Sequence, residues 1–291
     1  MLKFFKTLAL SCVLSLTAIS AHAETALKPI GENVYDFFSG WYNSLVVVGD
    51  NGVLVVDPAW SARAEEMKAA IAKVTDKPIT HVVLSHEHYD HAGGTEVFEN
   101  AEIVCQVTCE TIFDLDIIGA APKKVTTTFE DDLSINLGNK IVELKHIAAG
   151  DGVATTVVYV PADQVVATAD LYLPGGLTNQ KYLDDKNFLG TRLILNEISQ
   201  WPLKVSLSGH SDNRDPESLK ASAAYYNDLY SVVKTELDAL IAKGGIGAAF
   251  DALLGDLPNQ IKLPKYENWK GYNEHLSAHV FRMGMSIAHG G

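Results

Sequence analysis

Residues 85–94 read Ser-His-Glu-His-Tyr-Asp-His-Ala-Gly-Gly and place four potential metal ligands within six residues: His86, His88, Asp90 and His91. The preceding segment, 80–84, is an apolar run typical of a strand. A strand that ends in a ligand-bearing loop is a rigid base for a metal site. The first two histidines can bind one ion from a single turn, whereas Asp90 and His91 point differently and suit a second ion. A His-rich surface loop is the simpler alternative, but this ligand spacing, closed by two glycines, favours a metal site.

Imidazole and carboxylate together favour zinc or another divalent first-row metal over calcium or magnesium.

The segments before this motif alternate between strand and helix patterns. Residues 44–48 and 53–57 are apolar, mostly β-branched runs joined by the turn 49–52, Gly-Asp-Asn-Gly. An Asn-Gly between two such runs is a strong hairpin signal. Residues 62–74 carry apolar side chains at helical spacing, which predicts an amphipathic helix. The resulting strand, helix and strand form a βαβ unit whose ligand loop lies at the carboxyl end of its second strand.

Two later strands end in further potential ligands. Residues 125–144 are predicted to form a β-meander. The apolar strand 164–169 is followed by Asp170, and the strand 204–208 is followed by a glycine and His210. Both side chains are therefore expected at strand ends, where the histidine motif also lies.

The remainder of the chain, 213–291, is predicted to be helical. One helix is expected from Pro216 to Ile241, with proline in its first turn, and a second over 246–254. A final aromatic-rich helix is expected over 263–285. The apolar spacing indicates packing against the rest of the chain or against a partner subunit, so it is compatible with a homodimer.

The first 23 residues have the organisation of a secretory signal peptide. A basic start with Lys3 and Lys6 precedes an apolar run over 7–19, and Ala-His-Ala at 21–23 supplies a cleavage site. The run is too short for a membrane span, so we expect an exported, periplasmic protein without a membrane anchor. Cleavage removes the two lysines and changes the formal net charge from −13 to −15. An acidic chain argues against nucleic acid and anionic membranes as partners.

Cys105 and Cys109 remain after this cleavage. Four residues apart in an exported chain, they can form a small-loop disulfide. Alternatively, Cys105 fills the interior of a strand over 101–107 as a small apolar side chain. So small a loop removes little chain entropy, which favours two thiols or a dispensable bridge. Neither cysteine is a good candidate nucleophile.

The histidine motif resembles the signature of the metallo-β-lactamase-fold hydrolases, and the strands ending at Asp170 and His210 match the same pattern. The resemblance implies an α+β fold, a four-layer αββα sandwich over most of residues 28–212, within a domain of 24–212. Residues 213–291 are then a helical C-terminal extension packed on the same domain. The implied ligands of two divalent metal ions are His86, His88, Asp90, His91, Asp151, Asp170 and His210. The first ion takes His86, His88 and the residue at position 151, while Asp170 bridges the two ions and Asp57 supports the loops without binding metal.

Position 151 departs from the family pattern. Aligned on the strand Val-Val-Tyr-Val-Pro at 157–161, the usual third histidine of the first metal falls on Asp151. Asp151 can replace it as a carboxylate ligand, with the usual Zn–O distance of about 2.0–2.2 Å. It can also be an ordinary turn residue between two glycines, or His146 can substitute for it. A carboxylate here makes the site more anionic, so that it binds manganese or iron more readily and raises the pKa of bound water.

The resemblance implies that a metal-bound or bridging hydroxide is the nucleophile. Asp90 then orients the hydroxide and returns a proton to the leaving group. The favoured function is an exported metal-dependent hydrolase of a small-molecule ester, lactone, thioester, amide or phosphoester. A periplasmic metallo-β-lactamase is a second hypothesis, weakened by the missing third histidine and the long tail. A non-hydrolytic protein, either iron oxygenase-like or purely metal-binding, is a third.

Overall fold

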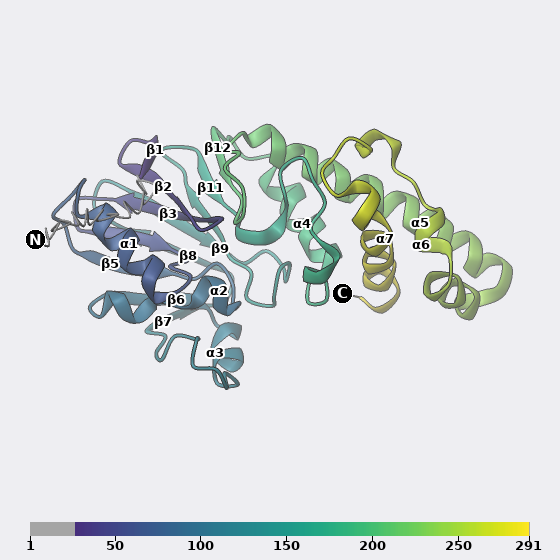
Figure 1. Ribbon diagram of the computed structural model, residues 1–291, viewed down its shortest axis with the longest axis horizontal. Coiled ribbons are helices and arrows are strands. Elements are labelled where there is room, and N and C mark those ends of the chain that lie inside the picture. Colours follow the sequence, from purple (N-terminus) through teal and green to yellow (C-terminus); the bar gives the residue numbers. More distant parts are fainter. Residues whose placement is uncertain (1–26, 291) are drawn as a thin grey trace, which may run out of the picture.

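The computed structural model describes residues 27–290, and Figure 1 shows strands packed in two layers with helices outside them. The first sheet contains, in spatial order, β1 (Lys28–Gly31), β2 (Val34–Ser39), β3 (Tyr42–Val48), β4 (Val53–Val56), β5 (Ile79–Val83), β6 (Glu102–Gln106) and β7 (Thr127–Phe129). The second contains β12 (Val205–Leu207), β11 (Val165–Ala167), β10 (Val157–Val160), β9 (Ile141–Lys145) and β8 (Asp132–Asn136). Strands β1 to β4 are antiparallel neighbours, whereas β4 to β7 run parallel, as do β11 and β12.

Alternating apolar side chains separate the layers. Val46 and Val55 belong to a core beneath α1 (Ser61–Ile71), whereas their neighbours Leu45 and Leu54 belong to the core between the sheets. Both faces of these strands are therefore covered, as expected for the central strands of a sheet with helices on its outer side. Each fully buried valine or leucine stabilises the fold by roughly 1.5–3 kcal/mol relative to an exposed one.

Helices cover the outer face of each sheet (Figure 1). The first sheet is covered by α1, α2 (Tyr89–Ala92), η1 (Thr95–Phe98) and α3 (Thr108–Phe113). Between β11 and β12 of the second sheet the chain forms η2 (Ala169–Leu171), η3 (Gln180–Tyr182) and α4 (Phe188–Ile198). After β12 it forms α5 (Pro216–Leu254), α6 (Leu257–Gln260), η4 (Pro264–Tyr266) and α7 (Tyr272–His289). Val157 and Val166 of the second sheet share one core with apolar side chains of α4, α5 and α7. The predicted αββα sandwich with a helical C-terminal extension is confirmed.

The C-terminal helices begin and bend where their sequence specifies. The Asp215 carboxylate accepts a hydrogen bond from Glu217 N at 3.0 Å and caps α5, whose first residue is a proline. Gly245, with φ +76°, bends α5, so the helices predicted over 216–241 and 246–254 form one long kinked helix. The helix predicted over 263–285 is wrong at its start, because Gly271 at φ +75° precedes the first turn of α7. No helix among residues 27–290 is long and apolar enough to cross a membrane.

Residues 125–144 do not form the predicted β-meander. β7 pairs with β6 in the first sheet, while β8 and β9 pair with each other in the second. The chain crosses between the sheets at Glu130 and Asp131. The prediction was wrong because the sequence of a three-residue strand such as β7 does not indicate which strand it pairs with. That partner is set by the tertiary structure, which places β7 beside β6 at the edge of the first sheet.

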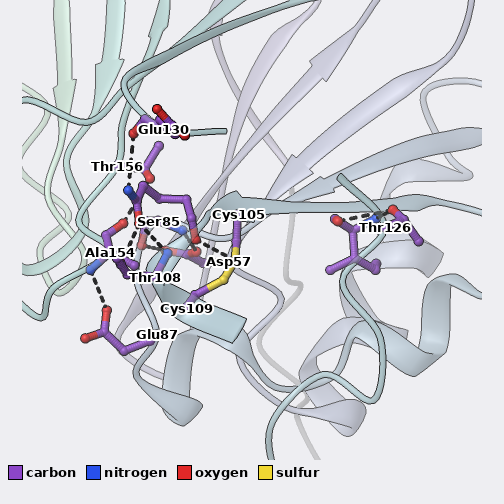
Figure 2. The surroundings of a disulfide bond; sticks show 12 residues. Asp57, Ser85, Glu87, Cys105, Thr108, Cys109, Thr126, Glu130, Ala154 and Thr156 are labelled. Atoms are coloured by element: carbon purple, nitrogen blue, oxygen red, sulfur yellow. Dashed lines mark hydrogen bonds between the residues drawn. A yellow bond between two sulfur atoms is a disulfide. The ribbon is translucent and has the colours of Figure 1, made fainter. Parts of the chain in front are cut away.

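A disulfide joins Cys105 of β6 to Cys109 of α3 (Figure 2). The side chains of both cysteines are buried. Of the alternatives open for this pair, the small-loop disulfide is therefore formed, and Cys105 also fills the interior of its strand. The predicted signal peptide, 1–23, lies outside the described residues.

Candidate metal centre

The structure brings all seven predicted ligands to one edge of the sandwich. β5 leads into the histidine motif, the turn before β10 contains Asp151, and β11 and β12 are followed by Asp170 and His210. Because β11 and β12 are parallel neighbours, their carboxyl ends lie side by side. Two sets of potential ligand atoms result, and within each set the atoms lie within 4.8 Å of one another. One set comes from His86, His88 and Asp151, and the other from Asp90, His91 and His210.

Each of the four imidazoles has one ring nitrogen bonded outside the centre. The outer partners are Ser85 Oγ for His86 Nδ1 (2.9 Å), Asp185 Oδ2 for His88 Nε2 (2.6 Å), Asp57 Oδ2 for His91 Nδ1 (3.1 Å) and Trp41 O for His210 Nδ1 (2.9 Å). Metal-binding histidines have such an outer partner, which sets the tautomer and the orientation of the ring. The other nitrogens are Nδ1 of His88 and Nε2 of His86, His91 and His210.

Three buried polar atoms lie where the two sets meet and have no hydrogen-bond partner among the described residues: His86 Nε2, His91 Nε2 and Asp170 Oδ1. Buried polar atoms without a partner are rare, and each one requires an explanation. The other Asp170 oxygen lies 2.9 Å from His210 Nε2 and 3.4 Å from His91 Nε2, between the two rings. Imidazole nitrogen and carboxylate oxygen are donors suited to a divalent first-row metal, so these residues fit the predicted ions.

The pKa values at this point differ between the imidazoles and the carboxylate. Burial, together with the charges of His91 and His88, holds the pKa of His86 well below its ordinary value, so the ring is neutral. Burial raises the pKa of Asp170, but the attraction of His91 and His210 outweighs it and holds this pKa well below the ordinary value. Asp170 is therefore ionised. His86 and Asp170 can therefore bind a metal ion without first losing a proton, whereas neighbouring carboxylates raise the pKa values of His88, His91 and His210 against the effect of burial, so these three rings must release a proton when they bind the ion.

Asp57 supports the histidine motif from β4. Its Oδ1 accepts from Ser85 N at 2.8 Å, and its Oδ2 from Ser85 Oγ at 2.5 Å, as Figure 2 shows. Asp57 also lies close enough to His86 and His91 for a third set of ligand atoms. Both of its carboxylate oxygens are already hydrogen-bonded, however, so we assign it the supporting role that the resemblance implies.

Tyr42 contacts a predicted ligand and Arg63 supports the segments behind it, although neither was predicted from the sequence. The Arg63 side chain of α1 is 1% exposed and donates to Tyr42 O at 2.8 Å and to Asp57 O at 3.3 Å. It thereby joins the start of β3 to the end of β4. The Tyr42 hydroxyl donates to Asp90 Oδ2 at 2.9 Å. Burial and this hydrogen bond raise the pKa of Tyr42, so the hydroxyl keeps its proton and orients the Asp90 carboxylate.

Glu87 fixes the turn that contains Asp151. Its carboxylate accepts hydrogen bonds from Val153 N at 2.7 Å and Ala154 N at 3.0 Å, the second of which is visible in Figure 2. Gly152 has φ +78°, and a Cβ atom there would lie 2.5 Å from Glu87 Oε2, so this position requires glycine. Asp151 is 3% exposed, and its Oδ1 lies 3.8 Å from His88 Nδ1.

His146 does not take the place of Asp151. Its Nδ1 bonds to Thr155 O at 2.8 Å, and His146 belongs to neither set of ligand atoms. The Asp151 carboxylate lies in one set of potential ligand atoms with His86 and His88, and its role as a metal ligand stays a prediction.

The loop before α4 supplies two charged residues that sequence analysis missed. Asp185 is the outer partner of His88, and Lys186 forms a buried ion pair with Asp151. The Lys186 ammonium also donates to Asp170 O at 2.9 Å. No motif in the sequence marks either residue, because each acts on ligands that lie far away along the chain.

A cavity of about 1270 Å³ opens onto the centre. Its wall includes His88, Asp90, Asp151, Asp170 and His210, and its rim includes the aromatic side chains of Trp41 and Tyr182. Trp41 is 76% exposed and Tyr182 is 67% exposed, so both rings face solvent at the entrance. The volume exceeds the roughly 300–1,000 Å³ of common small-molecule sites.

Comparison with known proteins agrees with this geometry. The profile described as "Metallo-beta-lactamase superfamily" matches residues 42–210, which include all seven predicted ligands. The 2,4-dinitroanisole O-demethylase subunit alpha of Nocardioides sp. (strain JS1661) is 26% identical over 157 residues, 52% of this chain and 48% of that protein. The chain thus spans about half the length of this relative. The metallo-beta-lactamase type 2 of Elizabethkingia meningoseptica is 24% identical over 233 residues, 73% of this chain and 90% of that protein.

Among solved structures, the stereoselective inverting sec-alkylsulfatase Pisa1 from Pseudomonas sp. superposes with a TM-score of 0.69 at 15% identity. The match covers 90% of this chain and 50% of the sulfatase, so it extends into the C-terminal helices. At this identity the likeness concerns the fold alone. The superfamily profile spans more than half of the 291 residues, and the ligand edge lies within it, so the chain belongs to the metallo-beta-lactamase superfamily.

Proposed function

We propose that this protein is an exported hydrolase with a binuclear metal centre. One divalent ion is bound by His86, His88 and Asp151, and the other by Asp90, His91 and His210, with Asp170 between them. The observation that carries the proposal is the set of four imidazoles whose outer nitrogens are all bonded, so that the inner nitrogens converge with buried carboxylate oxygen. Zinc suits this donor set, and the carboxylate of Asp151 also admits manganese or iron.

Divalent ions held by these residues would supply a hydroxide nucleophile near neutral pH and polarise the group that it attacks. The residues of the chain orient the reaction. Asp90 faces the cavity, and the Tyr42 hydroxyl orients its carboxylate, which would position the hydroxide and return a proton to the leaving group. The cavity fits a small-molecule ester, lactone, thioester, amide or phosphoester, and its rim offers aromatic rings for an apolar substituent.

The first experiment is elemental analysis of the mature protein purified without added metal, wild type beside Asp151→Ala. We expect two equivalents of metal in the wild type and a value near one in the variant, because the first ion loses its carboxylate ligand. Asp184→Asn is the matched control, since Asp184 lines the same cavity but belongs to neither ligand set. One equivalent in both wild type and Asp151→Ala would contradict the binuclear centre.

Activity is then measured on a panel of nitrophenyl esters, a lactone, a phosphodiester, an alkyl sulfate, 2,4-dinitroanisole and nitrocefin, before and after EDTA treatment. We expect EDTA-sensitive turnover of at least one of the first three. Turnover of nitrocefin above the others would instead assign a β-lactamase, the activity for which the Elizabethkingia relative is named. A protein that binds metal and turns over no member of the panel would favour the non-hydrolytic alternative.

A further inference from the structure

Lys186 is a buried cation at the edge of the first ligand set. It is 3% exposed, and its ammonium contacts Asp151 Oδ2 and the backbone oxygen of Asp170 at 2.9 Å. A buried ammonium without charged or polar partners is strongly disfavoured. The position of Lys186 therefore depends on the two segments that supply Asp151 and Asp170.

Lys186 leaves Asp151 with one carboxylate oxygen for a metal. Oδ2 is occupied by the ammonium, whereas Oδ1 lies 3.8 Å from His88 Nδ1, on the side of the inner nitrogens. A carboxylate that is restricted in this way binds through a single oxygen, as a histidine binds through a single nitrogen. The Lys186 charge also offsets the charge of Asp151, so that the pair is formally neutral, as an imidazole is.

The backbone holds Lys186 in this place. Residues 151 and 186 form an isolated β-bridge, and Asn187 N donates to Gly150 O at 2.8 Å. From α7, Arg282 Nε donates to Lys186 O at 2.5 Å. Lys186 is thus fixed from both the ligand turn and the C-terminal helices, as expected for a side chain whose position matters to the centre.

We propose that Lys186 is a positioning residue of the first metal site: it occupies one oxygen of Asp151, directs the other to the ion and compensates the charge of the carboxylate. The inference rests on the proposed binuclear function. It predicts that positions 151 and 186 act as one unit. The first site should bind metal when position 151 is Asp and position 186 is Lys, or when position 151 is His and position 186 carries a neutral side chain. It should bind metal poorly when position 151 is His and position 186 is Lys.

The test is a double-mutant cycle in the full mature chain with Asp151→His, Lys186→Met and the double variant. First-site affinity for zinc is measured by competition with a chromophoric chelator. We expect Asp151→His alone to weaken this affinity by about 100-fold or more, because an imidazole then adjoins a buried ammonium. Adding Lys186→Met to it is expected to recover at least about 10-fold. Equal affinity of Asp151→His with and without Lys186→Met overturns the proposal.

The single variant Lys186→Met provides a second readout that loss of packing alone does not move. Without the compensating charge the site is more anionic, so the pH of half-maximal turnover is expected to rise by about one unit or more. Lys181→Met is the control, since Lys181 lines the same cavity and is exposed. An unchanged pH profile in Lys186→Met also overturns the proposal. If the wild-type protein binds no metal, both the proposed function and the role of Lys186 are wrong. If it binds two ions but the variants at positions 151 and 186 show no coupling, only the role of Lys186 is wrong.

Discussion

His88 shows how much of this centre depends on residues outside the histidine motif. Its ring lies between Asp151 on the inner side and Asp185 on the outer side, 2.6 Å from His88 Nε2. Burial lowers the pKa of His88, but the hydrogen bond that its ring donates to Asp185 and the charge of Asp151 outweigh this effect and raise the pKa above its ordinary value. Asp185 therefore both orients the ring and makes its inner nitrogen more basic, which favours a metal ion and a proton alike.

Asp185→Asn is expected to weaken metal binding at the first site by roughly 10-fold at neutral pH, because the outer partner of His88 loses its charge. Chelator competition on the purified variant measures the change. Asp184→Asn removes the same charge from the adjacent position and is expected to leave the affinity unchanged. An equal loss of metal affinity in the two variants would show that the overall negative charge of the loop strengthens metal binding and that the hydrogen bond between Asp185 and His88 does not.

Helix α7 illustrates the same dependence for a whole element. Its His279 is 1% exposed, with Nε2 2.9 Å from Thr178 O and Nδ1 3.0 Å from the Tyr225 hydroxyl of α5. Burial lowers the pKa of His279 to about 4, so the ring is neutral and joins α5 to α7.

A lowered folded-state pKa makes the C-terminal helices sensitive to acid. Below about pH 6.5 the unfolded chain binds a proton at His279 that the folded chain does not bind until about pH 4. Stability is therefore present above pH 6.5 and is lost as the pH falls towards 4. Between pH 7 and pH 5 this one group is expected to cost about 2 kcal/mol of unfolding free energy.

Urea unfolding of metal-free protein at pH 7 and pH 5 measures this loss. His279→Gln is expected to lose about 2 kcal/mol less than the wild type between the two pH values, whatever its stability at pH 7. His289→Gln, on the exposed end of the same helix, is the control. The same pH dependence in wild type and His279→Gln would contradict the assignment.

The molecule as a whole is organised so that its C-terminal helices contribute to the metal centre. Figure 1 shows α4 and α5 beside the second sheet, with α6 and α7 extending the molecule on that side. Arg282 of α7 donates to Lys186 O, and Ser286 Oγ accepts from Phe188 N at 3.4 Å. The loop that carries Asp185 and Lys186 is thus held between the second sheet and α7.

Arg282→Ala is expected to weaken first-site metal affinity by roughly 10-fold while the protein remains folded, because the loop loses its contact with α7. Circular dichroism checks the fold, and chelator competition measures the affinity. Arg192→Ala is the matched control, since Arg192 of α4 stacks on Tyr230 and bonds to Asn227 without contacting the loop. Unchanged first-site metal affinity in Arg282→Ala would show that the C-terminal helices cover the second sheet without contributing to the metal centre.

The histidine motif, the strand before it and the strand ends at Asp170 and His210 were predictable from the sequence. These signals are local, because a ligand pattern within six residues or a run of apolar residues needs no knowledge of the rest of the chain. The two helical segments that α5 joins were predictable for the same reason, since Asp215, Pro216 and Gly245 lie beside the positions on which they act.

The pairing of β7 with β6, and the roles of Tyr42, Arg63, Asp185 and Lys186, follow only from the folded chain. Lys186 meets Asp151 across 35 residues, and Tyr42 meets Asp90 across 48. A single charged or hydroxyl side chain forms no periodic pattern, and no neighbouring residue in the sequence indicates its partner. The close approach of strand ends and loops at one edge of the sandwich creates these contacts, and with them the charge balance of the proposed first metal site.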